Sequence, residues 1–203
     1  MKYLFATNNP DKVSEIKAIL GEAGLEVISL ADLGLSFEPT ETGQTFKENA
    51  GQKARKTAQF LQENGHNNIA VLSDDSGLCI DAMDGEPGVD SANFMGRETP
   101  YNIRNQYIIN QMLNVPDEKR TARFVCVIYC LMPPQEGGNI ITTTGEVEGM
   151  IAHGPRGSNG FGYDPIFLVK EYGKTTAELT AEEKNKISHR GKALRLMVRE
   201  LKD

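Results

Sequence analysis

Two adjacent carboxylates, Asp74 and Asp75, follow a short apolar run at residues 69–72. The run predicts a strand, and the Asp-Asp-Ser-Gly sequence after it predicts a turn at the polar end of that strand. Neighbouring carboxylates repel each other unless a cation or a proton lies between them, and Mg²⁺ prefers oxygen ligands while keeping waters and phosphates. The pair therefore indicates a metal site for phosphate chemistry. An Asp-rich turn whose side chains bind their own backbone is the alternative.

A second group suited to phosphate lies between a short apolar strand and the first predicted helix. An Asn-Pro pair is a good helix start, and the free N–H groups of such a start bind anions. The Gly-x-x-x-x-Gly-Lys-Ser/Thr spacing of a P-loop is absent, and a capped helix with a solvated lysine is equally compatible with the pattern. The candidate phosphate-binding residues here are Thr7, Asn8, Asn9, Pro10, Asp11 and Lys12.

Glu41 and Lys53 flank the start of a helix predicted over residues 46–62. Asn49 and Lys53 are four residues apart and share one face of that helix. Charged residues on a helix are usually solvated, but Glu41 precedes the helix, where a loop can carry it toward Asp74 and Asp75. We therefore expect Glu41 to approach the acidic pair, whereas a solvated position remains the default for Lys53.

A glycine-rich segment, residues 154–167, offers groups suited to a nucleotide base. Glycine permits close backbone approach, Phe161 offers a stacking face, and Asp164 offers an acceptor to a base N–H. A hairpin around a core phenylalanine would explain the glycines equally well. Further along the chain, His189 and Arg190 lie beside a helix start, although such pairs are usually surface residues.

Composition restricts the class of protein. The 203 residues carry a formal charge of −6 and a pI near 5.2, which argues against a general nucleic-acid or membrane surface. The three cysteines show no metal-ligand spacing with the three histidines, and no run approaches the ~20 apolar residues of a membrane span. Lys2 and a short strand follow Met1 without a signal-peptide pattern, so we expect a cytoplasmic protein.

Hydrophobic periodicity and turn residues predict the elements that must position these groups. Alternation of strands and helices in the first half, followed by long apolar strands, predicts one mixed α/β domain over residues 1–203, in two lobes around a cleft. The predicted helices cover residues 10–23, 46–62 and 100–113, with a last helix after a capping box at residues 180–183. The predicted strands cover residues 2–6, 25–30, 69–72, 78–82, 92–94, 122–132, 140–147 and 165–169.

Five motifs together resemble the inosine/xanthosine triphosphate pyrophosphatase family, in its order and approximate spacing. They are TNNPDK, ETGQTFKENA, SDDSGL, GSNGFGYDPIF and EEKNKISHRGKAL. The resemblance implies an α/β fold with an elongated mixed β-sheet flanked by helices, two lobes with a nucleotide cleft between them, and a homodimer. It also implies hydrolysis of ITP, dITP and XTP to the nucleoside monophosphate and pyrophosphate, with Mg²⁺ as cofactor.

The resemblance also implies residue roles. The segment Thr7 to Lys12 resembles the triphosphate cradle, and Lys53 a second phosphate contact. Asp75 resembles the general base, and Ser76 a substrate contact. The implied metal and water site comprises Glu41, Asp74 and Asp75, and the implied base pocket comprises Phe161, Gly162, Tyr163, Asp164, Lys184, His189 and Arg190.

Two other functions fit parts of the same pattern. A Maf-type pyrophosphatase would act on pyrimidine or modified nucleotides, whereas Phe161 and the His189-Arg190 pair favour a purine. A nucleotide-binding module without turnover would have no need of the acidic cluster. A substrate panel distinguishes the three.

Overall fold

The computed structural model describes residues 1–202 and contains a mixed α/β fold. The longer helices are α1 (Pro10–Glu22), α2 (Phe46–Glu63), α3 (Tyr101–Gln111), α4 (Ala181–Ile187) and α5 (His189–Glu200). The strands are β1 (Lys2–Phe5), β2 (Glu26–Ile28), β3 (Ala70–Ile80), β4 (Thr121–Leu131), β5 (Ile140–Ile151), β6 (Phe167–Val169) and β7 (Lys174–Thr175).

The strands pair in the order β2-β1-β3-β4-β5-β6-β7. β1 is parallel to both β2 and β3, whereas β6 is antiparallel to β5 and β7, so the sheet is mixed as predicted. The chain forms two compact units, and the boundaries between them fall within β3, β4 and β5 and at the start of α5. Unit 1 comprises residues 1–75, 126–145 and 190–203, and unit 2 comprises residues 76–125 and 146–189.

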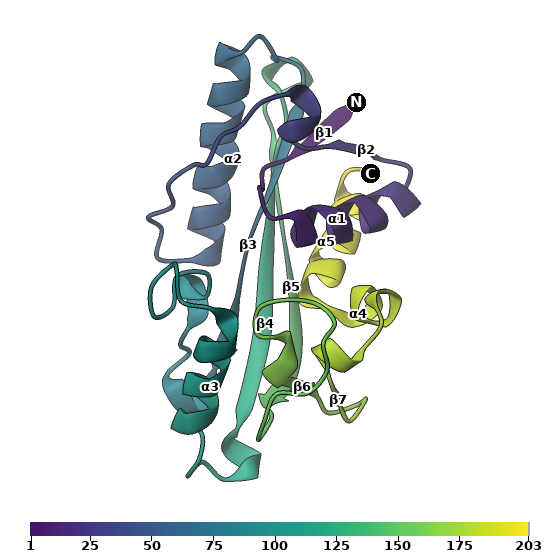
Figure 1. The fold of residues 1–203 in the computed structure, drawn as a ribbon. Coiled ribbons are helices and arrows are strands. Elements are labelled where there is room, and N and C mark those ends of the chain that lie inside the picture. The colour runs from purple at the N-terminus through teal and green to yellow at the C-terminus, as the bar shows by residue number, and fades with distance from the viewer. Residues whose placement is uncertain (203) are drawn as a thin grey trace. The chain divides into compact units, whose positions relative to one another are not determined.

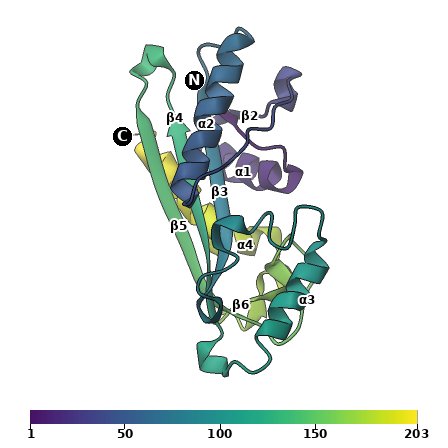
Figure 2. The ribbon, with the colours of Figure 1, turned by 90° about the vertical axis from the view of Figure 1, so that its left-hand side faces the viewer.

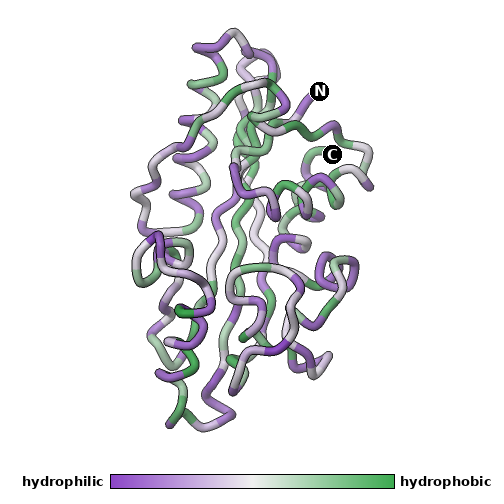
Figure 3. The backbone as a smooth tube through the Cα atoms, in the orientation of Figure 1, coloured by the Kyte–Doolittle hydropathy of each residue, from purple (hydrophilic) through white to green (hydrophobic). Residues whose placement is uncertain are grey.

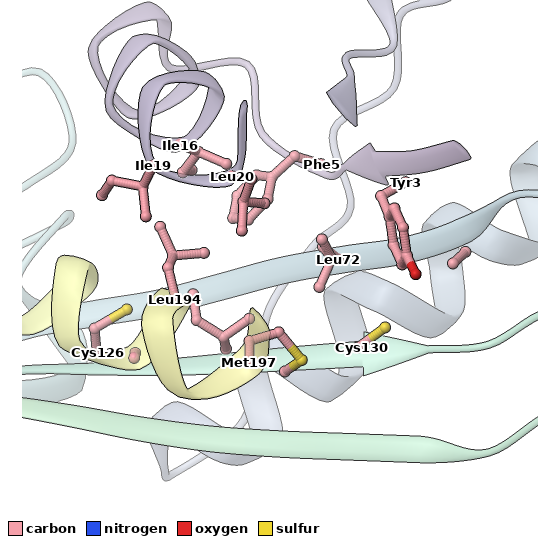
Figure 4. Packing of buried hydrophobic residues seen from close by; sticks show 13 residues of the cluster. Tyr3, Phe5, Ile16, Ile19, Leu20, Leu72, Cys126, Cys130, Leu194 and Met197 are labelled. Carbon is pink, nitrogen blue, oxygen red and sulfur yellow. The ribbon is translucent and has the colours of Figure 1, made fainter. Parts of the chain in front are cut away.

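In unit 1, α1 and α5 cover one face of the sheet and α2 covers the other (Figures 1 and 2). Leu20 of α1 and Leu194 of α5 meet over Phe5 and Leu72 of the strands, as Figure 4 shows. Burial of such large apolar side chains supplies most of the favourable free energy of folding. The two helices are therefore anchored over β3 from the same side.

Helix α2 packs its small apolar residues, Ala50 and Ala54, against the opposite face of unit 1. Its hydropathy alternates along the chain in Figure 3, as expected for a helix with one buried stripe. The helix begins with a capping box, in which Thr45 and Glu48 satisfy each other's backbone N–H groups. This start determines where the loop before α2 ends.

Unit 2 has its own apolar cluster, which includes Leu78, Ile108, Tyr163 and Phe167. Arg104 of α3 is buried, and its guanidinium donates to backbone carbonyls of the loop at residues 91–97. These bonds tie α3 to the backbone of that loop. Among residues 1–202, none of the helices combines the length and apolar character needed to cross a bilayer.

Three predicted elements differ from the structure. β3 continues through Asp74 and Asp75 to Ile80, so the predicted turn there is wrong and the strand predicted at 78–82 is the continuation of β3. Residues 92–94 form a turn, where Arg104 binds the backbone of Ala92. The last helix is divided at Ser188, whose extended backbone separates α4 from α5.

Candidate active site

Asp74 and Asp75 lie within β3 and face opposite sides of the unit 1 sheet. Successive side chains of a strand point to opposite faces. Leu72, two residues before Asp74, belongs to the cluster under α1 and α5, whereas Val71 belongs to the cluster under α2. Asp74 therefore points toward α1 and α5, and Asp75 points toward α2. This geometry differs from the prediction that the two carboxylates share one site.

Asp74 is a counter-ion on the side of α1 and α5. Its carboxylate has no exposed surface, and its oxygens lie 2.8 and 3.0 Å from Nζ of Lys12. Nε of Arg190 lies 3.3 Å from the same carboxylate, and Arg190 also pairs with Glu15. Burial alone would raise the pKa of Asp74, but the charges of Lys12, Arg190 and Lys53 hold it well below its ordinary value. Asp74 is thus ionised, and its carboxylate is paired with Lys12 and Arg190.

The N-terminus of α1 carries Lys12 and is capped by the side chains before it. Asn9 caps the helix by accepting from the backbone N–H groups of Asp11 and Lys12, at 2.9 and 3.3 Å. Pro10 occupies the first helical turn, where a missing N–H costs nothing. Thr7 in turn accepts from the N–H of Asn9, at 3.2 Å. The side chains of Thr7 and Asn9 therefore satisfy the first N–H groups of α1, and Lys12 is the cationic side chain at this helix start.

Lys53, Glu41 and Asn49 gather on the α2 side of β3. Nζ of Lys53 donates to the backbone carbonyl of Asp74 at 2.8 Å and lies 3.0 Å from the Glu41 carboxylate. The amide of Asn49 donates to the Asp75 carboxylate at 3.2 Å. The structure therefore brings together the predicted residues Glu41, Lys53 and Asp75.

The electrostatics of Asp75 are opposite to those of Asp74. Burial raises the pKa of Asp75 to about 7, and the negative charges of Glu41 and Asp74 add to this rise, although Lys53 opposes it. Burial would lower the pKa of Lys53, but Asp74, Glu41 and Asp75 raise it above its ordinary value. One lysine therefore stays charged beside a carboxylate that can exchange a proton near neutral pH.

Two of the three carboxylates predicted to bind a metal, Glu41 and Asp75, lie on the α2 side of β3. Within residues 1–202, no cluster of three or more His, Cys, Asp or Glu side chains is arranged to hold a metal. Asp74 is occupied by Lys12 and Arg190, which argues against its predicted role as a ligand. Glu41 and Asp75 remain, and Mg²⁺ is commonly held by one or two carboxylates together with waters and substrate phosphates.

In unit 2, Asp164 organises the predicted base pocket. It is buried, and one carboxylate oxygen accepts from the N–H of Phe161 and from Nζ of Lys184, both at 2.8 Å. The other oxygen accepts from the hydroxyl of Thr176 at 2.8 Å. Nζ of Lys184 lies 4.7 Å from the centre of the Phe161 ring. Asp164 thus holds the loop and the lysine in place, which adds a positioning role to the base contact that the sequence predicted.

The neighbouring loop residues are also held within unit 2. The Tyr163 hydroxyl donates to the carbonyl of Ser91 at 2.8 Å, and Asn105 donates to the carbonyl of Gly162 at 3.1 Å. Gly162 has a φ of +67°, a conformation that suits glycine. Hydrogen bonds to Ser91 and Asn105 therefore hold the loop that carries Phe161.

His189 and Arg190 are adjacent in sequence but belong to different units. The His189 ring stacks on Phe124 of unit 2, with ring centres 4.8 Å apart. Arg190 binds Asp74 and Glu15 in unit 1, which differs from the base contact predicted for it. Ser76 is the half-buried first residue of unit 2.

Sequence reasoning missed four residues that hold this site. Asn49 shares a helix face with Lys53, and Glu15 is one helical turn after Lys12, so spacing alone could have indicated both. Thr176 and Phe124 have no such signal, because their partners are distant in sequence.

Comparisons with known proteins identify the family of this chain. The sequence profile of the Ham1 family matches residues 3–200. A dITP/XTP pyrophosphatase of Exiguobacterium sibiricum is 46% identical over 96% of this chain and 94% of its own length. One of Bacillus subtilis is 46% identical over 95% of this chain and 92% of its own length.

Solved structures give the same result. The Ham1 protein of Staphylococcus aureus has a TM-score of 0.84 and 38% identity to this chain, covering 100% of this chain and 98% of its own. A HAM1 protein from Coxiella burnetii also has a TM-score of 0.84, with 37% identity and the same coverage. The family indicated by the five motifs is confirmed, and the chain belongs to the Ham1 family.

Proposed function

We propose that this protein hydrolyses non-standard purine nucleoside triphosphates, namely ITP, dITP and XTP, to the nucleoside monophosphate and pyrophosphate. One observation carries the proposal: two lysines and a carboxylate whose pKa is raised to about 7 gather at one segment of β3. Relatives at 46% identity that are named dITP/XTP pyrophosphatases support the substrate class.

The residues of unit 1 suit cleavage between the α and β phosphates. Lys12, at the N-terminus of α1, would bind phosphate oxygens, and Lys53 would neutralise charge on the leaving pyrophosphate. Asp75 would accept a proton from the attacking water, because a base with a pKa near the working pH is effective in either direction. The water oxygen bonds to the α phosphorus, and the α–β bridging bond breaks.

Glu41 and Asp75 are the residues that would hold Mg²⁺. When bound, the ion would neutralise phosphate charge and organise the triphosphate. The raised pKa of Asp75 supports this assignment, since Glu41 and Asp74 both repel its charged form and a cation would relieve that repulsion.

The residues of unit 2 suit recognition of the base. Phe161 would stack on the purine, and Lys184 would donate to the 6-oxo group that distinguishes hypoxanthine and xanthine from adenine. Asp164, by fixing both residues, would keep that geometry.

The remaining parts of the proposal concern assembly and location. We include a homodimer, supported by exposed apolar side chains on α3, where Ile103 is 50% and Tyr107 39% exposed. We also include a cytoplasmic location, because the proposed substrates belong to the nucleotide pool. Light scattering and cell fractionation test these two parts.

A substrate panel with product identification tests the function. The purified protein is incubated with Mg²⁺ and ITP, dITP, XTP, GTP, ATP or dTTP. Pyrophosphate should appear stoichiometrically with IMP from ITP, and EDTA should stop the reaction. Release of orthophosphate with accumulation of IDP would refute the proposal, preference for pyrimidine nucleotides would favour a Maf-type enzyme, and binding without turnover would indicate a nucleotide-binding module.

A further inference from the structure

Asn49 lies between two groups of the proposed active site. It is 6% exposed, at the first turn of α2. Its amide nitrogen donates to the Asp75 carboxylate at 3.2 Å, and its amide oxygen accepts from the backbone N–H of Gly43 at 2.7 Å. Gly43 is two residues after Glu41 in the loop before α2. One amide therefore connects Asp75 to the loop that carries Glu41.

The approach of this loop to Asn49 is unusually close. A Cβ on Gly43 would lie 2.7 Å from the Asn49 amide oxygen and 2.6 Å from Cβ of Glu48. Any side chain at residue 43 would thus push the loop away from α2. The absence of a side chain at Gly43 therefore allows its backbone N–H to reach the Asn49 amide oxygen.

The same helix contains a second clamp on the loop that does not involve Asp75. The side-chain oxygen of Gln52 accepts from the backbone N–H of Thr42 at 3.0 Å and lies 3.3 Å from the Thr42 hydroxyl. Substitution of Gln52 therefore removes a contact that holds the loop before α2 but leaves the contact with Asp75 in place.

We propose that Asn49 is a positioning residue of this active site, which sets the Asp75 carboxylate relative to the loop that carries Glu41. The inference rests on the proposed function. Partners that orient metal-binding carboxylates typically contribute 10-fold to 100-fold to metal affinity or activity. The bond to Gly43 holds the loop, and the bond to Asp75 orients the carboxylate, so the two roles belong to different atoms of the same side chain.

Two substitutions separate those roles. Asn49→Asp keeps an oxygen that can accept from Gly43 but removes the N–H donor to Asp75. Asn49→Ala removes both bonds. If Asn49 orients Asp75, each variant should lower kcat on ITP about 10-fold or more while KM stays within about 3-fold. Gln52→Ala should keep kcat within about 3-fold of the wild-type value.

A metal measurement without substrate gives a second readout. Mn²⁺ alone is titrated into the full-length protein, and the free ion is followed by electron paramagnetic resonance. Asn49→Ala should weaken Mn²⁺ binding about 10-fold, whereas Gln52→Ala should bind as the wild type does. Thermal unfolding of each variant identifies any that has lost its fold, and the comparison is made among the folded ones.

The outcomes separate this inference from the proposed function. Near-normal kcat in Asn49→Asp, equal kcat losses in Asn49→Ala and Gln52→Ala, or unchanged Mn²⁺ affinity in Asn49→Ala would each overturn the positioning role. A wild-type protein that hydrolyses none of the nucleotides would instead refute the proposed function. The Mn²⁺ titration would still decide what Asn49 does.

Discussion

The two faces of β3 in unit 1 put identical side chains to different uses. On the side of α1 and α5, Asp74 is fully buried and surrounded by Lys12 and Arg190, so its charge is stable. On the side of α2, Asp75 has Asn49 and Lys53 near it but is also repelled by Glu41, and its pKa rises to about 7. The difference shows that the surroundings of a carboxylate decide whether it stays ionised as a counter-ion or can exchange a proton near neutral pH.

The largest expected effect comes from removing the charge on the buried face. Asp74→Asn leaves Lys12 and Arg190 without their counter-ion, and breaking a buried ion pair in this way typically costs about 3–5 kcal/mol. We expect a loss of that size in the free energy of unfolding, measured by urea denaturation. An unfolding free energy equal to that of the wild type would show that the two faces do not differ as described.

Asp75→Asn should affect catalysis. The expected rise in activation free energy is smaller than the loss of unfolding free energy expected for Asp74→Asn. The substitution keeps the shape of the side chain but removes the proposed base and metal ligand, so turnover of ITP should fall about 100-fold or more. Pyrophosphate release measures it, and circular dichroism should show a folded protein. Substantial residual turnover would mean that the α2 face is not the reactive one.

The ionisation of Asp75 should make the free energy of unfolding decrease with rising pH. Because its pKa in the folded protein is about 7, above the ordinary value of 3.8, the native state binds this proton more tightly than the unfolded chain. Stability should therefore fall as the pH rises from about 4 to about 7 and then level off.

The Asp75→Asn variant should lose this component of the pH dependence, since asparagine does not titrate. Urea denaturation of both proteins at several pH values between 4 and 8 tests this expectation. The effect should be smaller than that of Asp74→Asn, because Asp75 is only half-buried and Lys53 partly offsets the repulsion. Parallel pH profiles would argue that Asp75 is already ionised at low pH.

The smallest expected effects concern base selection. Arg190 binds Asp74 on the side of α1 and α5, next to Lys12, the proposed phosphate ligand. Arg190→Ala should therefore lower kcat/KM for ITP and ATP by similar factors. Lys184→Ala should instead narrow the ratio between the two substrates by about 3-fold to 10-fold, which corresponds to one hydrogen bond. A smaller ratio of kcat/KM for ITP to kcat/KM for ATP in the Arg190 variant would instead support the base contact that the sequence predicted for Arg190.

Several local features were readable from the sequence. Asn9 and Pro10 start α1 as predicted, and the Thr180 capping box starts α4. The predicted helix at 46–62 agrees with α2 within one residue. These features depend on residues within a few positions of each other, so local rules suffice for them.

The sequence by itself thus determined the α/β class, the main helices and strands, the family, and the grouping of Glu41 with Asp75. Only the tertiary structure decided that the Asp-Asp-Ser-Gly segment is strand and not turn, because pairing within the sheet overrides the turn preference of these residues. Once the segment is a strand, its pleat must send Asp74 and Asp75 to opposite faces. Arg190, the partner of Asp74, lies 116 residues away, and no local pattern can reveal that pairing.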